Sequence, residues 1–139
     1  MILVDTNVVS ELMRPAPAPA VLAWFATQAA ADLFLSAVSE AELRAGAACL
    51  PAGRRRDALT AAIDAMVAED FAGRLLAFDS PAARSYALIA ATRRAAGQPI
   101  AQADCQIAAT AHAHGAAVAT RNVADFLGCG IAVIDPWKS

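Results

Sequence analysis

The sequence predicts an α/β fold in which a short-stranded, mostly parallel five-stranded sheet is covered by helices on both faces, in three α/β/α layers. Short apolar runs alternate with helical segments along the whole chain. These runs lack polar alternation, which is typical of parallel strands buried on both faces. The 139 residues are 58% hydrophobic and only 17% charged, which suits one hydrophobic core and excludes disorder. We therefore expect one domain spanning residues 1–139.

The predicted strands are the short apolar runs themselves. The first runs into Asp5 and a helix start, and the last stops at Asp135 and Pro136. Their expected bounds are Ile2–Val4, Leu33–Leu35, Leu75–Asp79, Ala117–Ala119 and Ile131–Ile134.

The predicted helices fill the segments between the strands. Prolines from Pro15 onward separate the first two, and Gly97 and Gly115 follow two of the later ones. Their expected bounds are Val8–Met13, Val21–Ala29, Ser39–Leu50, Arg54–Phe71, Pro81–Ala96, Ala101–His114 and Val123–Leu127.

Composition and charge exclude several classes of protein. The longest charge-free stretches, Pro15–Ala31 and Cys105–Thr120, are interrupted by prolines or polar residues, so neither predicts a membrane span. No basic segment precedes Asp5, so we expect no signal peptide and a cytoplasmic protein. A net charge of −2 predicts no broad basic surface for nucleic acid. Three cysteines without C-x-x-C spacing argue against a zinc site.

Four acids fall near expected strand ends or helix starts. Asp5 closes the first strand, and Glu42 and Asp125 follow the second and fourth strands within a few residues. Asp104 opens a helix without a strand just before it, so its convergence with the others is an assumption. The carboxyl ends of parallel strands meet at one edge, where ligands bind. At Asp5 an acid ends a buried strand, which is costly unless it is paired or metal-bound.

Each of the other acids also has a purely local explanation. Ser39 and Glu42 have the spacing of a capping box, and Asn122 and Asp125 could cap a short turn. Asp104 would be favoured by the dipole at a helix N-terminus. Capping and catalysis therefore both remain open for these acids.

A carboxylate cluster without histidine partners indicates a hard cation. Oxygen ligands suit Mg²⁺ or Mn²⁺ rather than zinc. Two such ions about 4 Å apart would hold a phosphodiester for in-line attack by water. His112 and His114 are two residues apart on a predicted helix and face different sides, so we do not interpret them as ligands.

Four segments in order resemble the motifs of PIN-domain ribonuclease toxins of the VapC/FitB-like type, and a fifth resembles the closing segment of the FitB-like branch. The resemblance covers the whole chain. The five segments are Ile2–Glu11, Ser39–Gly46, Ile100–Ala109, Ala119–Phe126 and Val133–Trp137.

The resemblance implies a PIN-like fold and a Mg²⁺- or Mn²⁺-dependent endoribonuclease, the toxin of a type II toxin–antitoxin pair, with one or two ions. Carried over by position, Asp5, Glu42 and Asp104 are the catalytic and metal-binding acids. Many relatives have an aspartate where this chain has Asn122, and others carry the acid three residues later. We therefore take Asp125 as the fourth catalytic and metal-binding acid, acting directly or through a water, with Asn122 as a neutral neighbour.

Further residues are expected to support the acids or the substrate. Those that would orient the carboxylates through hydrogen bonds are Thr6, Asn7, Thr120 and Asn122. Helix capping is the alternative for the threonines. Candidate RNA contacts, with an exposed solvated surface as the alternative, are Arg121, Arg54, Arg55 and Arg56.

The resemblance also implies partners: a cognate antitoxin, an RNA substrate, a second copy of the chain in a homodimer, and DNA only indirectly through the antitoxin. No membrane partner is expected. The main alternative is a catalytically silent PIN domain that acts as a partner-binding module. A haloacid-dehalogenase-like phosphohydrolase would need a second aspartate two residues after Asp5, where this chain has Asn7.

Overall fold

The sheet is five-stranded and entirely parallel, in the order β3-β2-β1-β4-β5. The structure is a computed structural model that describes residues 1–138. The predicted domain ends at Ser139, which lies outside the described residues. The strands are β1 (Ile2–Val4), β2 (Leu33–Ser36), β3 (Leu75–Leu76), β4 (Ala117–Ala119) and β5 (Val133–Ile134). The predicted fold class is confirmed.

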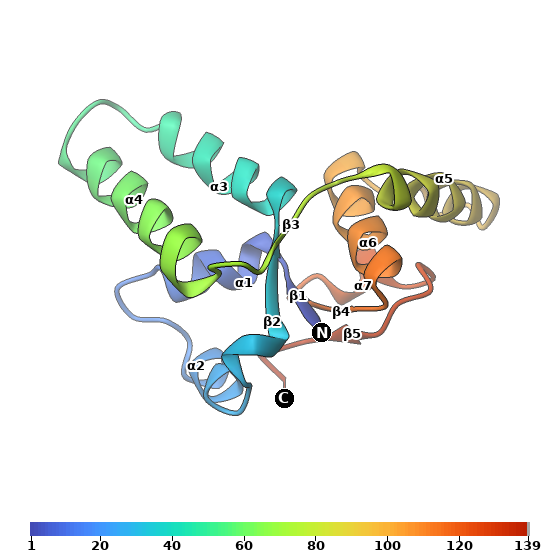
Figure 1. Cartoon of the computed structure of the whole chain (residues 1–139), viewed down its shortest axis with the longest axis horizontal. Helices are drawn as coiled ribbons and strands as arrows, with labels where there is room; N and C mark the ends of the chain where they lie inside the picture. The colour runs from blue at the N-terminus through green and yellow to red at the C-terminus, as the bar shows by residue number, and fades with distance from the viewer. Residues whose placement is uncertain (139) are drawn as a thin grey trace.

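Helices cover both faces of this sheet (Figure 1). The helix pairs α3–α4 and α5–α6 lie on opposite sides of the sheet in that view. The helices are α1 (Thr6–Leu12), α2 (Pro19–Ala26), α3 (Ala37–Ala48), α4 (Arg54–Ala65), α5 (Ser80–Ala95), α6 (Gln102–His114) and α7 (Val123–Phe126). No helix within residues 1–138 has the length and apolar character that crossing a bilayer requires.

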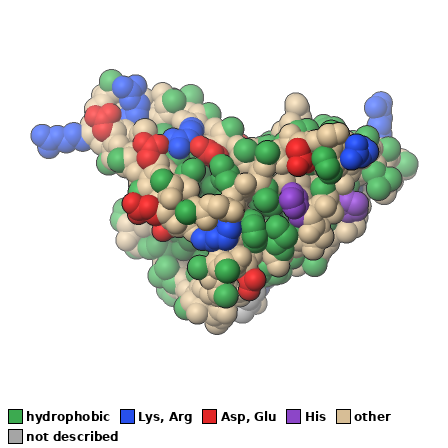
Figure 2. Space-filling model, in the orientation of Figure 1, with side chains coloured by type: hydrophobic (Ala, Val, Ile, Leu, Met, Phe, Trp, Pro, Cys, Tyr) green, Lys and Arg blue, Asp and Glu red, His purple; other side chains and the backbone are tan. Residues whose placement is uncertain are grey.

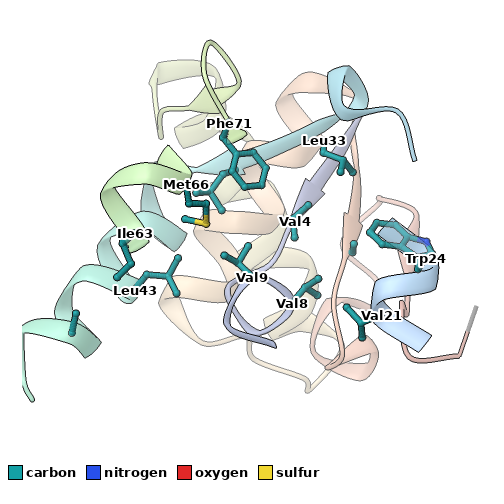
Figure 3. Close-up of a cluster of buried hydrophobic side chains, with 13 residues drawn as sticks. Val4, Val8, Val9, Val21, Trp24, Leu33, Leu43, Ile63, Met66 and Phe71 are labelled. Carbon is teal, nitrogen blue, oxygen red and sulfur yellow. The ribbon is translucent and has the colours of Figure 1, made fainter. Parts of the chain in front are cut away.

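Alternate residues of β1 enter two different cores. Val4 belongs to the cluster under α1 to α4, which includes Trp24 and Ile63 (Figure 3). Leu3 belongs to the cluster under α5 and α6, which includes Ile107. Burial on both faces explains why the strands have no polar alternation.

Some element bounds differ from those predicted. The segment predicted as one helix, Arg54–Phe71, is α4 followed by a π-helical turn at Met66–Asp70. The third strand stops at Leu76 instead of Asp79, because Asp79 is the N-cap of α5 and its side chain accepts from the backbone N–H of Ala82.

The topology fixes the place of the site. β1 lies at the centre of the sheet, between β2 and β4. Because all strands are parallel, the segments that follow them emerge at one edge. The strand order reverses at β1, and that position is where open α/β sheets form ligand crevices.

Candidate active site

Asp5 directly follows β1 and is buried, with 4% of its surface exposed. Its Oδ1 accepts a hydrogen bond from the backbone N–H of Thr6 (2.8 Å), so it also caps α1. Its Oδ2 accepts from Thr120 Oγ1 (2.8 Å) and from Asn7 Nδ2 (3.2 Å). Burial is the main cause that raises the pKa of Asp5, and the charge of Glu42 acts in the same direction.

Thr120 joins the ends of β1 and β4. Its buried hydroxyl donates to Asp5 and accepts from the backbone N–H of Asn122 (3.0 Å) and from Asn7 Nδ2 (3.4 Å). Asn7 Oδ1 in turn accepts from the backbone N–H of Arg121 (3.3 Å). These bonds fix the orientation of the Asp5 carboxylate.

Glu42 reaches the same edge from α3. Its Oε1 accepts a hydrogen bond from Thr6 Oγ1 (2.7 Å), which lies 3.0 Å from Ser39 Oγ. The capping-box interpretation of Ser39 and Glu42 is wrong. The N-cap of α3 is Ser36, whose hydroxyl accepts from the backbone N–H of Ser39 (3.0 Å).

Asp104 lies in the first turn of α6 and is half-buried. Burial raises its pKa to about 6, with further increases from the charges of Asp5, Asp125 and Glu42. The charge of Arg93 acts in the opposite direction. At neutral pH the cluster thus carries mutually repelling negative charges, which a cation would relieve.

The acids from three segments of the chain share one cleft with a volume of about 500 Å³. It is lined by Asp5, Thr6, Asn7, Ser10, Glu11, Arg14, Glu42, Asp104 and Asn122. Asp125 is exposed and is not among the lining residues, although its charge acts on Asp5 and Asp104. The alternative role for Asn122, a side-chain cap on α7, is absent.

The donor set of this cleft fits a hard cation. Asp5, Glu42 and Asp104 offer carboxylate oxygens, and within residues 1–138 no ion pair joins any of them to a basic side chain. The described residues contain no three His, Cys, Asp or Glu side chains arranged to hold a metal ion by themselves. Mg²⁺ is compatible with this, because it usually keeps several waters and takes one or two carboxylates.

The candidate RNA contacts lie in different places. Arg121 directly follows Thr120, and its guanidinium lies over the ring of Trp137, with Cζ 4.9 Å from the ring centroid. The run at positions 54–56 begins α4 and does not line the cleft. On the face shown in Figure 2, Lys and Arg side chains are scattered rather than gathered in one patch.

Sequence reasoning missed one wall of the cleft, which consists of Ser10, Glu11 and Arg14. The available signal was an acid and an arginine three residues apart at the end of an apolar helix. Glu11 is 6% exposed, so its charge, like that of Asp5, is costly to bury unless it is paired.

Comparison with known proteins decides the family. A family model described as "PIN domain" matches residues 2–126. The chain belongs to the PIN domain family. The chain is 47% identical to "VapC ribonuclease Y4jK" of Sinorhizobium fredii over 99% of both chains, and 44% identical to "Toxin FitB" of Neisseria gonorrhoeae over 99% of both.

The solved structures agree with this assignment. The crystal structure of FitAcB from Neisseria gonorrhoeae matches with a TM-score of 0.94 at 43% identity, covering all of both chains. This PIN domain is therefore a full-length homologue of VapC/FitB-type toxins, and the predicted resemblance is confirmed.

Proposed function

We propose that the chain is a metal-dependent endoribonuclease and the toxin of a toxin–antitoxin pair. The observation that carries this is the cleft, where Asp5, Glu42 and Asp104 from three separate segments meet without an ion pair to any basic group within residues 1–138. The names of the VapC and FitB relatives support ribonuclease and toxin roles.

In this proposal, Asp5, Glu42 and Asp104 hold one or two Mg²⁺ or Mn²⁺ ions, with Asp125 contributing from the rim. Bound metal supplies positive charge for the phosphorus oxygens and lowers the pKa of water. Thr6 keeps the Glu42 carboxylate turned into the cleft, and Thr120 does the same for Asp5. We propose water as the nucleophile, because a metal held by these carboxylates would lower its pKa.

The test is cleavage of single-stranded RNA with Mn²⁺ or Mg²⁺, with Asp5→Asn as the control. We expect cleavage by the native chain, loss on addition of EDTA, and loss in the variant. A native chain that binds its antitoxin but cleaves no RNA with either metal would instead indicate a silent partner-binding module.

We further propose that a cognate antitoxin inhibits by placing an arginine among the cleft acids, because a guanidinium pairs bidentately with carboxylates. DNA would be reached only through the antitoxin, in keeping with a solved structure of "FitAB bound to IR36 DNA fragment". An antitoxin complex that leaves Asp5, Glu42 and Asp104 open and still cleaves RNA would contradict this.

The chain is also proposed to form a homodimer. Several large apolar side chains are exposed in the single chain, among them Leu88 at 60% and Leu127 at 53%. Light scattering of the antitoxin-free protein at micromolar concentration should give the mass of two chains; a monomer would contradict the proposal.

A further inference from the structure

Glu11 is a buried carboxylate that the proposed reaction does not use. Its Oε2 accepts from the backbone N–H of Ala18 (3.0 Å), and its oxygens lie 3.2 and 3.4 Å from Arg14 Nη1. The hydrogen bond from Ala18 is the main cause that lowers its pKa, and Arg14 and Arg121 act in the same direction. Glu11 therefore stays ionised beside Arg14.

Arg14 is held at one end and open at the other. It lines the same cleft as the acids, yet 65% of its side chain is exposed. Among the described residues, Nη1 is the Arg14 nitrogen that has a hydrogen-bond partner. Its remaining guanidinium donors are available to a ligand in the planar geometry that suits phosphate.

Arg121 is held from a different side. Its backbone N–H is bound by Asn7, and its guanidinium lies over Trp137. Trp137 packs against the buried cluster beneath α1 to α4, which gives the stack a fixed base. Asn7, which binds Arg121, and Asn122, which follows it, line the same cleft as Arg14, so Arg121 lies beside that cleft.

We propose that Arg14 and Arg121 together bind a backbone phosphate of the RNA beside the acidic cluster, and that Glu11 and Trp137 are the positioning residues that hold the two guanidinium groups there. This rests on the proposed nuclease function. An RNA chain is the favoured occupant because its phosphates have to approach a cleft lined by carboxylates. Arg14 in the cleft wall and Arg121 beside the cleft counter that repulsion.

The test measures binding of a short fluorescein-labelled single-stranded RNA in EDTA as a function of salt concentration. All proteins carry Asp104→Asn, which reduces repulsion and silences cleavage, and gels verify that the RNA stays intact. The variants are Arg14→Ala, Arg121→Ala, their combination, Arg14→Lys and Glu11→Gln. Arg94→Ala, an exposed arginine on α5, is the matched control.

We expect the double variant to weaken binding about tenfold and to reduce the slope of log K against log salt by about 0.7, the loss of one phosphate contact on a single strand. Arg14→Lys should keep the slope because it keeps the charge. Glu11→Gln should weaken binding with the slope unchanged, because Arg14 remains but loses its anchor. Loss of stability alone would not change a salt slope, and melting curves verify folding.

A double variant with the affinity and slope of the Arg94→Ala control would overturn the proposal. Cleavage with Mn²⁺ by the native chain, measured separately, distinguishes the two ideas. If the native chain cleaves RNA and the slope is unaffected, the phosphate site is wrong and the nuclease stands. If the slope falls but nothing is cleaved, the phosphate site stands and the nuclease is wrong. Variants that weaken only antitoxin binding would assign the two arginines to a protein partner and overturn the RNA proposal.

Discussion

Helix α1 has a buried carboxylate at each end, and their pKa values shift in opposite directions. Asp5 precedes the helix and Glu11 lies in its last turn, with 4% and 6% exposure. Burial dominates at Asp5 and raises the pKa, whereas the N–H of Ala18 and the charge of Arg14 lower that of Glu11. Burial alone therefore does not set the pKa of a carboxylate; what differs at Glu11 is that a backbone N–H and an arginine together outweigh the cost of burial.

The largest expected effect tests this difference by neutralising each acid. Asp5→Asn should lower kcat for RNA cleavage by about 10²–10³-fold, comparable to removing one key electrostatic group from an active site. Glu11→Gln should act mainly on KM, with kcat changed only a few-fold. The measurement is steady-state cleavage of a fluorogenic RNA in Mn²⁺. Equal losses of kcat would remove the distinction between the two ends.

A smaller effect is expected from the hydroxyl that orients Glu42. Thr6→Val removes the 2.7 Å hydrogen bond while keeping the side-chain shape, and it should lower cleavage about 10–100-fold. Thr110→Val is the matched control, because that buried hydroxyl donates to the carbonyl of Gln106 within its own helix. If both variants lose activity equally, the loss reflects packing rather than orientation of the carboxylate.

Neutralising Asp104 and neutralising Glu11 should change the melting temperature in opposite directions. In EDTA at low salt, Asp104→Asn should melt several degrees higher than the native chain, because it removes one of the repelling charges. Glu11→Gln should melt lower, because it leaves Arg14 unpaired. With saturating Mg²⁺ the native chain should melt higher than Asp104→Asn, since metal at 100 times Kd stabilises the native chain by about 2.7 kcal/mol. A lower melting point for Asp104→Asn would instead support a helix-capping role.

The smallest expected effect is a dependence of apo stability on pH. The pKa of Asp104 is raised to about 6, so the folded chain binds its proton more tightly than the unfolded chain. The stabilisation that Asp104 gives the folded chain is fully present below about pH 4 and is lost as the pH rises through 6. The pKa of Glu11 is lowered, so Glu11 stabilises the folded chain at pH values above its ordinary pKa, and this stabilisation is lost as the pH falls. The measurement is the melting temperature in EDTA as a function of pH. Asp104→Asn should flatten the part of this curve near pH 6, and Glu11→Gln should flatten its acidic part.

The sequence predicted the layered fold because strands and helices differ in length and period, and those patterns survive in the structure. Asp5 was identifiable because an acid at the end of a buried strand needs a reason. Asp104 was not derivable in the same way, because no strand precedes α6 and only the packing of α6 against the sheet brings it to the cleft. The Ser39 capping box failed because Ser36, three residues earlier, competes for the same role. Glu11 was missed since its partners, Ala18 and Arg14, depend on the path of the chain after α1.

The position of β1 in the sheet has a consequence for synthesis of the chain. β1 is translated before the other strands of this sheet, and one of its two neighbours, β4, follows more than a hundred residues later. The bond between Asp5 and Thr120 spans a sequence separation of 115. In a nascent chain that has not yet exposed β4, Asp5 therefore lacks its hydrogen bond from Thr120, and the cleft is not formed. Contacts of such long range form late, so the acidic site is completed only after β4 and Thr120 have left the ribosome.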